Sequence, residues 1–445
     1  MTSVASQVIH RALQTGASDA ECVFAEGEEF SANVRLGEVE SVKEAGSKAL
    51  GLRVLIGHCS GSAYTSDLSA AGLEKLVESA VGLAQITSED PCHGLPEVGE
   101  LGSVGADLDL FHEDVRDLPA EEKIALAKQC ERAALDLDSR ITNSEGGSCS
   151  SGWGRRLLVN SRGFQGEYRR SLCSVSTVPV AQSGEDMQRD WWFTIGRSFA
   201  TLEPADQVGR RAAERALQRL GAVKVETKRV PVVFEPRAAR TLVSNLFEAV
   251  SGDSIYRHAS FLAGKLGERV AAEGVTVVDD GLLPGGFGTS PFDDEGVPTR
   301  RTLVIENGVL RSYLLNSYTA RKLGLKTTGN ASRSLAGNPG IGPGNLYLQA
   351  GPHTPEQIIA SVQDGFYVTE LIGFGVNMVT GDYSRGAAGL WIRNGELAFP
   401  VHEVTIAGNL NRMLEDIEMV GSDLEFRGAV AAPTLKIREM TVGGK

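Results

Sequence analysis

The order of hydrophobic periodicities along the chain constrains the fold more than any other feature of the sequence. Amphipathic helices are predicted in the first half over residues 4–14, 69–86, 119–137 and 206–220. Short alternating strands are predicted at 22–25, 30–36, 49–56 and 62–64, with more strands and a hairpin turn over 156–180. Groups of strands that follow one another, instead of alternating strictly with helices, are typical of an α+β fold with antiparallel sheets.

A charged stretch at residues 222–229 separates a helix stop from a new apolar strand, and we place a domain boundary there. The sequence therefore predicts an N-terminal domain of helices and antiparallel sheet over residues 1–222. A strand-rich C-terminal domain is predicted over residues 228–445.

The second half has its own signals for helices, turns and a loop. A helix is predicted over 236–251 and a shorter one over 355–363. Asn-Gly turns between apolar runs, at Asn307-Gly308 and Asn394-Gly395, predict two hairpins. The stretch 329–351, rich in Gly, Pro and Asn, is expected to form a long surface loop.

Composition excludes several classes of protein. The net charge of −13 over 445 residues disfavours contact with nucleic acid, because the basic clusters are short and mixed with acids. The sequence shows neither a membrane span nor a secretory signal, so we expect a cytoplasmic protein. Six cysteines, none of them in a C-x-x-C pair, are expected to be free thiols, and none follows Cys173.

The most informative segment is Leu246 to Gly252, which has the shape of an H-E-x-x-x-H metallopeptidase helix without its imidazoles. Phe247 and Gly252 occupy the two histidine positions and cannot bind a metal, whereas Glu248 keeps the carboxylate. Taken alone, the segment favours a structural interpretation, in which Phe247 is a core residue and Gly252 is the C-terminal cap of the helix.

Three other segments allow two interpretations each. Residues 57–61 (Gly-His-Cys-Ser-Gly) form either a nucleophile elbow around Cys59 or a hairpin turn, and the strand character that resumes at residue 62 favours the turn. The acids Asp279-Asp280 and 293–295 form either a magnesium site or two turns that end in glycine.

The third segment, 380–386, places Asp382, Tyr383, Ser384 and Arg385 between glycines just before a strand. It is either a polar substrate or interface loop or an internally satisfied turn.

The second half resembles the TldD/PmbA family, in its PmbA (TldE) branch. The resemblance rests on ordered segments at 246–266, 290–296, 314–325, 379–389, 406–410 and 440–444. In the catalytic TldD branch, zinc is held by both histidines of H-E-x-x-x-H and by a cysteine near the C-terminus. These ligands fall on Phe247, Gly252 and the neighbourhood of 427–429, where this chain offers no donor.

The resemblance implies a non-catalytic subunit of a heterodimeric zinc metallopeptidase that degrades or trims unfolded and leader peptides. It implies no catalytic residue and no metal in this chain, with zinc in a TldD-like partner, and a homodimer stays open. The alternatives are a metal-independent hydrolase or a regulatory protein similar to a gyrase modulator. Whether the chain is an enzyme in its own right is left open.

Overall fold

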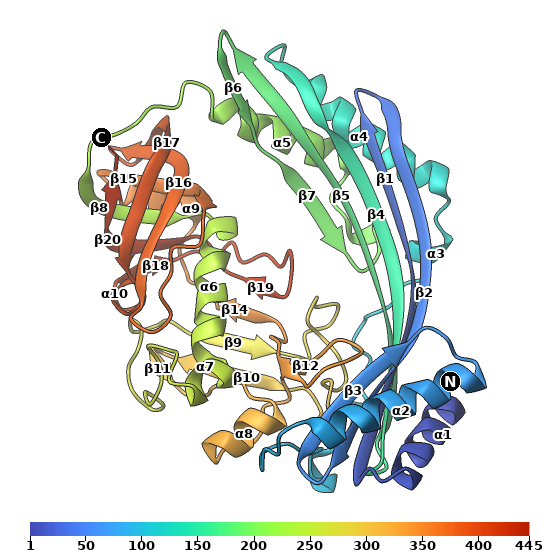
Figure 1. The fold of residues 1–445 in the computed structure, drawn as a ribbon. Helices are drawn as coiled ribbons and strands as arrows, with labels where there is room; N and C mark the ends of the chain where they lie inside the picture. Colours follow the sequence, from blue (N-terminus) through green and yellow to red (C-terminus); the bar gives the residue numbers. More distant parts are fainter. Residues whose placement is uncertain (445) are drawn as a thin grey trace.

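The computed structural model describes residues 1–444 and consists of an arched N-terminal sheet facing a strand-rich C-terminal half (Figure 1). The first half contains helices α1 (Thr2–Gln14), α2 (Ala70–Ile86), α3 (Asp114–Asp117), α4 (Ala120–Leu135) and α5 (Ala205–Gln218), and 3-10 turns at Val98–Glu100 and Phe199–Thr201. Its strands are β1 (Asp19–Arg35), β2 (Glu38–Ile56), β3 (Cys59–Thr65), β4 (Ile141–Asn160), β5 (Gln165–Ser183), β6 (Asp186–Arg189) and β7 (Trp192–Gly196).

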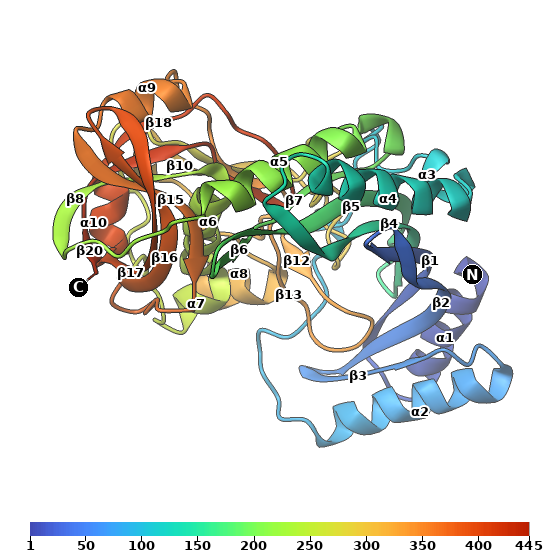
Figure 2. The ribbon, with the colours of Figure 1, turned by 90° about the horizontal axis from the view of Figure 1, so that it is seen from above.

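These seven strands form one antiparallel sheet in the order β3-β2-β1-β4-β5-β6, with β7 also paired to β5. Helices α1, α2, α4 and α5 all cover its convex face, where Cys22, Val34 and Cys149 are completely buried (Figures 1 and 2). The concave face looks toward the C-terminal half. The predicted α+β fold is confirmed, because helices and antiparallel sheet form separate layers.

The predicted strands lie within much longer ones. Strand β1 runs unbroken from Asp19 to Arg35, through the gap between the strands predicted at 22–25 and 30–36. Gly27 lies where strands approach closely, since a Cβ there would be 2.5 Å from the carbonyl oxygen of Trp153. This part of the sheet is exposed, so its residues need not alternate between apolar and polar, and periodicity predicted two short strands in place of one long one.

The second half contains helices α6 (Pro236–Val250), α7 (Gly252–Tyr256), α8 (Ser317–Leu323), α9 (Pro355–Ala360) and α10 (Leu410–Glu415). Its strands are β8 (Lys228–Phe234), β9 (Val277–Asp280), β10 (Arg301–Glu306), β11 (Val309–Leu310), β12 (Ala331–Ser332), β13 (Gly340–Ile341), β14 (Leu346–Leu348), β15 (Asp364–Ile372), β16 (Asp382–Arg393), β17 (Glu396–Asn409), β18 (Ile417–Val420), β19 (Val430–Ala431) and β20 (Leu435–Gly443).

Two sheets build this half. One has the order β17-β16-β15-β8-β20-β18, and an additional β17–β20 pairing closes five of its strands into a ring. The other has the order β11-β10-β9-β14-β19. Helix α6 packs against strands of both sheets, β15 of the first and β14 and β19 of the second. Both predicted Asn-Gly hairpins are present, between β10 and β11 and between β16 and β17.

The two halves of the chain meet in a buried contact around Glu21. Arg53 Nη1 on β2 and Arg333 Nη1 of the C-terminal half lie 2.6 and 3.1 Å from Glu21 Oε1, which is fully buried. Residues 329–351 are therefore only in part the predicted surface loop. They contain three short strands. Asn345 is completely buried, and its side-chain amide is satisfied by hydrogen bonds to the backbone at residues 280 and 288.

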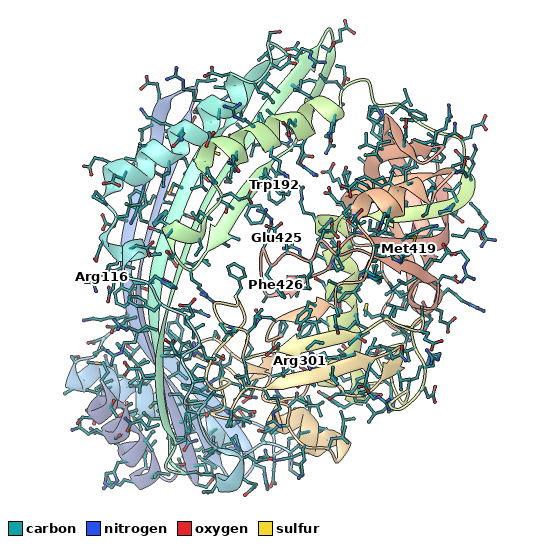
Figure 3. All side chains as sticks on the ribbon, turned by 180° about the vertical axis from the view of Figure 1, so that it is seen from behind. Arg116, Trp192, Arg301, Met419, Glu425 and Phe426 are labelled. Atoms are coloured by element: carbon teal, nitrogen blue, oxygen red, sulfur yellow. The ribbon has the colours of Figure 1, made fainter. Side chains whose placement is uncertain are left out.

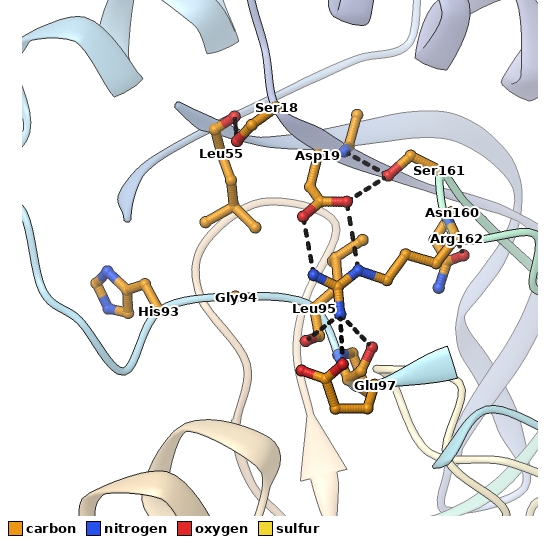
Figure 4. Close-up of polar contacts among 12 residues, drawn as sticks. Ser18, Asp19, Leu55, His93, Gly94, Leu95, Glu97, Asn160, Ser161 and Arg162 are labelled. Carbon is orange, nitrogen blue, oxygen red and sulfur yellow. Dashed lines mark hydrogen bonds and ion pairs between the residues drawn. The ribbon is translucent and has the colours of Figure 1, made fainter. Parts of the chain in front are cut away.

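Arg162 helps to hold the connection after α2 against the sheet (Figure 4). Arg162, in the turn between β4 and β5, donates to Asp19 Oδ2 at 3.1 Å and to the carbonyl oxygen of Pro96 at 2.9 Å. This link fixes the long connection between α2 and α3 although it contains little regular structure.

Candidate functional site

Helix α6 carries the segment that the sequence singles out. It begins with Pro236 at the first helical position, where the missing N–H has no intrahelical acceptor to lose. Leu242, Val243, Leu246 and Val250 form its buried face. The helix thus follows from a regular apolar stripe and a favourable start.

The helix stops at Val250, and Gly252 opens the short helix α7. Between them Ser251 is extended, with φ −62° and ψ 130°. The chain at Leu314 bridges the break, because its N–H donates to Val250 O at 3.0 Å and its carbonyl accepts from Gly252 N at 2.9 Å.

Gly252 is therefore not the C-terminal cap that the structural interpretation expected, and that expectation was wrong. Its φ is not positive, so conformational freedom does not explain the glycine. The reason is space: a Cβ at this position would lie 2.6 Å from both Leu315 Cδ2 and Thr319 Oγ1. A histidine at this position would collide with the start of α8.

The other two residues of the motif point elsewhere. Phe247 is half-buried and packs against the C-terminal core, whereas Glu248 is exposed. Within residues 1–444, the Glu248 side chain has neither an ion pair nor a hydrogen bond.

The stretch where the resemblance places a third ligand is a loop that reaches the N-terminal sheet. Arg427 bonds the carbonyl oxygen of Phe193 on β7, and its Nη2 lies 2.5 Å from Glu203 and 2.7 Å from Glu425. Its guanidinium carbon is 4.4 Å from the centre of the Trp192 ring. Figure 3 shows Trp192 and the Glu425–Phe426 loop between the sheet and the C-terminal half.

The donor set does not fit zinc. Zinc in proteins takes about three or four Cys, His or carboxylate ligands at bonding distance. No three such side chains gather to form a metal site anywhere in the described residues 1–444. At position 252 the side chains of Leu315 and Thr319 occupy the space that an imidazole would need.

The polar segment after Gly381 is part of strand β16, not a loop before it. Asp382 accepts hydrogen bonds from Thr380 Oγ1 at 2.7 Å and Asn409 Nδ2 at 3.1 Å, and these bonds lower the pKa of its carboxyl. Ser384 is exposed and Arg385 half-buried. Tyr383 is only 2% exposed and lies in the core, where burial raises its pKa to about 12. A substrate or interface role for these four residues stays a prediction.

Both acidic groups accept hydrogen bonds from within the chain, Asp293 from the backbone and Asp279 from a side chain. Asp293 accepts from the N–H groups of Glu295, Val297 and Ala331, and Asp279 accepts from Asn330 Nδ2 at 2.7 Å. Burial raises the pKa of Asp279 to about 7. A turn is present at residues 293–296, whereas Asp279 and Asp280 end strand β9, and within residues 1–444 the acids form no metal-binding group.

Cys59 likewise follows a two-residue hairpin turn and begins β3. The helix that a nucleophile elbow requires is absent there, since β3 continues to Thr65.

A cleft that the sequence did not reveal opens beside the first turns of α6. It holds about 500 Å3 and is bounded by Trp191, Trp192 and Phe193 on one side and by residues 236–241 of α6 on the other. A second hollow of about 760 Å3 lies on the concave face of the sheet, and Gly428 touches it. The run of three aromatic residues at 191–193 was the available signal, but its partners lie far away in the sequence.

Comparison with known proteins assigns the family. Models of the PmbA/TldA metallopeptidase match over residues 20–84 (domain 1), 113–220 (central domain) and 227–444 (C-terminal domain). The fold and the matched domains show that the chain belongs to the PmbA/TldD family, which is described as a metallopeptidase family.

Individual proteins of the same family are similar to this chain over almost its whole length. Metalloprotease PmbA of Escherichia coli O157:H7 is 39% identical, covering 97% of this chain and 94% of that protein. A PmbA homolog of Haemophilus influenzae is 35% identical, covering 99% and 95%.

Solved structures are also similar. A candidate modulator of DNA gyrase from Bacteroides thetaiotaomicron has a TM-score of 0.93 at 27% identity, covering 100% and 99% of the two chains. TldE from Thermococcus kodakarensis shares the fold, with a TM-score of 0.90 at 23% identity, covering 99% and 100%.

None of the helices described within residues 1–444 combines the length and the apolar character needed to cross a membrane.

Proposed function

We propose that this chain is the non-catalytic subunit of a heterodimeric zinc metallopeptidase, with the zinc held by a TldD-like partner. The observation that carries the proposal is the packing of Gly252 against Leu315 and Thr319, which excludes an imidazole from the second ligand position. A metallopeptidase helix without its ligands cannot activate water, so a family member of this kind needs the metal of another chain.

Within such a pair, the chain would wall and shape the space in which peptide is cleaved. Support comes from the hollow of about 760 Å3 on its concave sheet face and the adjoining cleft of about 500 Å3. Unfolded or leader peptides in extended form are the substrates we propose, because a folded domain exceeds these volumes. The chain would also hold the partner's active conformation and restrict entry.

Co-expression with a paralogue that has an intact H-E-x-x-x-H and a C-terminal cysteine tests this function. The purified pair, the partner alone and this chain alone are assayed on an unstructured peptide with and without a zinc chelator. We expect chelator-sensitive cleavage by the pair that is faster than cleavage by the partner alone. Chelator-sensitive cleavage by this chain alone would contradict the proposal.

A further inference from the structure

Some arginines of the cleft beside α6 are paired with a carboxylate, and others are not. Among its arginines, Arg215 donates to both oxygens of Glu235 at 2.9 Å, and Arg427 pairs with Glu203 and Glu425. Arg237 lies 3.5 Å from Asp190 and stacks on Trp191. These three guanidiniums hold the two halves together and have their countercharges.

Two further arginines of the cleft have no countercharge within residues 1–444. Arg211, on α5, makes only a stacking contact, with its guanidinium carbon 3.9 Å from the centre of the Trp192 ring. Arg240, on α6, has no ion pair and projects toward Gly428, where an added Cβ would lie 3.7 Å from its Nη1. Both residues line the cleft, and both are exposed.

A third donor of the cleft is also unused. Trp192 is only 4% exposed, and its indole Nε1–H has no acceptor among the described residues. A buried N–H without a partner costs free energy that an acceptor on a ligand would recover. Trp192 lines the same cleft as Arg211 and Arg240.

The carboxylates of the cleft are engaged by other groups. Glu235 and Glu425 pair with arginines, and Glu370 lies 2.6 Å from Arg219. Asp423 accepts from the N–H and the hydroxyl of Thr434 at 2.9 and 2.7 Å, and Glu356, at the rim, turns toward Thr354. The donors that remain are therefore those that suit an anion.

We propose that this cleft binds a carboxylate of an extended polypeptide between Arg211, Arg240 and the indole N–H of Trp192. Guanidinium groups present paired N–H donors that match the two oxygens of a carboxylate, and stacking on Trp192 holds Arg211 in place for this contact. The carboxylate belongs either to the chain terminus or to an acidic side chain. That the ligand is a peptide rests on the proposed function, but binding is measurable without the partner.

Isothermal titration of the full-length chain tests the proposal with three short N-acetylated peptides of Gly, Ser and Ala. One has a free C-terminal carboxylate, one is amidated, and one is amidated with a single internal Glu. We expect at least one carboxylate-bearing peptide to bind about tenfold or more tightly than the neutral amide. Preference for the free acid identifies the chain terminus as the source, and preference for the Glu peptide identifies the side chain.

Variants then locate the site. Arg211→Ala with Arg240→Ala should abolish the preference, and both residues are exposed, so the fold should survive. Arg210→Ala is the matched control, since Arg210 neighbours Arg211 but faces Asp206, outside the cleft. Equal affinity for all three peptides, no binding of any of them, or a preference that persists in the double variant would overturn the proposal. Failure of the proposed function would appear separately, as a pair without enhanced peptidase activity.

Discussion

The two ends of helix α6 differ in what surrounds them. At its C-terminal end, Gly252 is buried, and the chain around Leu314 to Thr319 fills the space where a side chain would go. At its N-terminal end, residues 236–241 face a cleft of about 500 Å3 lined with aromatic and arginine side chains. The end that carries the metal-binding motif in catalytic relatives is closed here, and the opposite end is open.

This difference between the two ends of α6 leads us to expect different roles for them. The closed end is stabilised by the absence of a side chain and by backbone hydrogen bonds to Leu314, so any enlargement disturbs it. The open end is held by ion pairs and stacking at Arg427 and Arg237, and two of its arginines, Arg211 and Arg240, have no countercharge within residues 1–444. We therefore expect substitutions at the closed end to change stability and those at the open end to change binding.

The largest expected effect is that of Gly252→His. The new side chain collides with Leu315 and Thr319, which are themselves buried, so the free energy of unfolding should fall by about 2–3 kcal/mol. Urea denaturation measures this change. Gly82→His is the control, because Gly82 is also helical but has no atom within 4 Å of an added Cβ.

A second arm of the same experiment adds Phe247→His to Gly252→His, which restores both histidines of the H-E-x-x-x-H motif. The double variant should still take up no stoichiometric zinc. A stable double variant that binds one zinc would break the contrast between the two ends.

Arg427→Ala should cost less, about 1–2 kcal/mol. The variant loses the stacking on Trp192 and the link to Phe193, but Glu203 and Glu425 are partly exposed and can be solvated. Thermal denaturation of the variant beside Arg412→Ala, an arginine with an 81% exposed side chain, checks this. A change no larger than that of the control would show that the Arg427 loop does not hold the two halves together.

The closed end should also make stability depend on pH. Glu295 accepts from Ser317 N at the start of α8, and burial raises its pKa above the usual 4.5. The folded protein then retains a proton that the unfolded chain has lost, so the free energy of unfolding falls as pH rises above about 4.5.

Glu295→Gln keeps an acceptor for Ser317 and removes this titration, so its stability should fall less steeply with pH. A residual slope is expected from Asp293, whose pKa burial also raises. Denaturation midpoints between pH 4.5 and 7, with the exposed Glu273→Gln as control, measure the difference. Identical slopes in Glu295→Gln and the unsubstituted chain would contradict this account.

The smallest expected effect is that of Arg240→Ala at the open end. Its side chain is exposed and without partners, so the free energy of unfolding should change by less than about 0.5 kcal/mol. Loss of more than that in urea denaturation would mean that Arg240 supports the fold and is not free to bind a ligand.

The sequence predicted what depends on local patterns. The helices with a regular apolar stripe, including α1, α2 and α6, and both Asn-Gly hairpins are present within a few residues of their predicted bounds. Long exposed strands were missed in part, because β1 and β2 carry polar residues on both faces in their middle sections.

The candidate site depended on contacts that no local pattern contains. Gly252 is explained by Thr319, and the cleft is formed by Trp192 meeting Arg427 across the two halves. The missing histidines were evident from the residues themselves. The reason why position 252 cannot regain one was visible only in the packing.

Metal content tests the central claim most directly. This chain is purified alone and after co-expression with the proposed TldD-like partner, and zinc per complex is counted by mass spectrometry. The account predicts no stoichiometric zinc in the isolated chain and one zinc per heterodimer. One zinc bound to the isolated chain would contradict it.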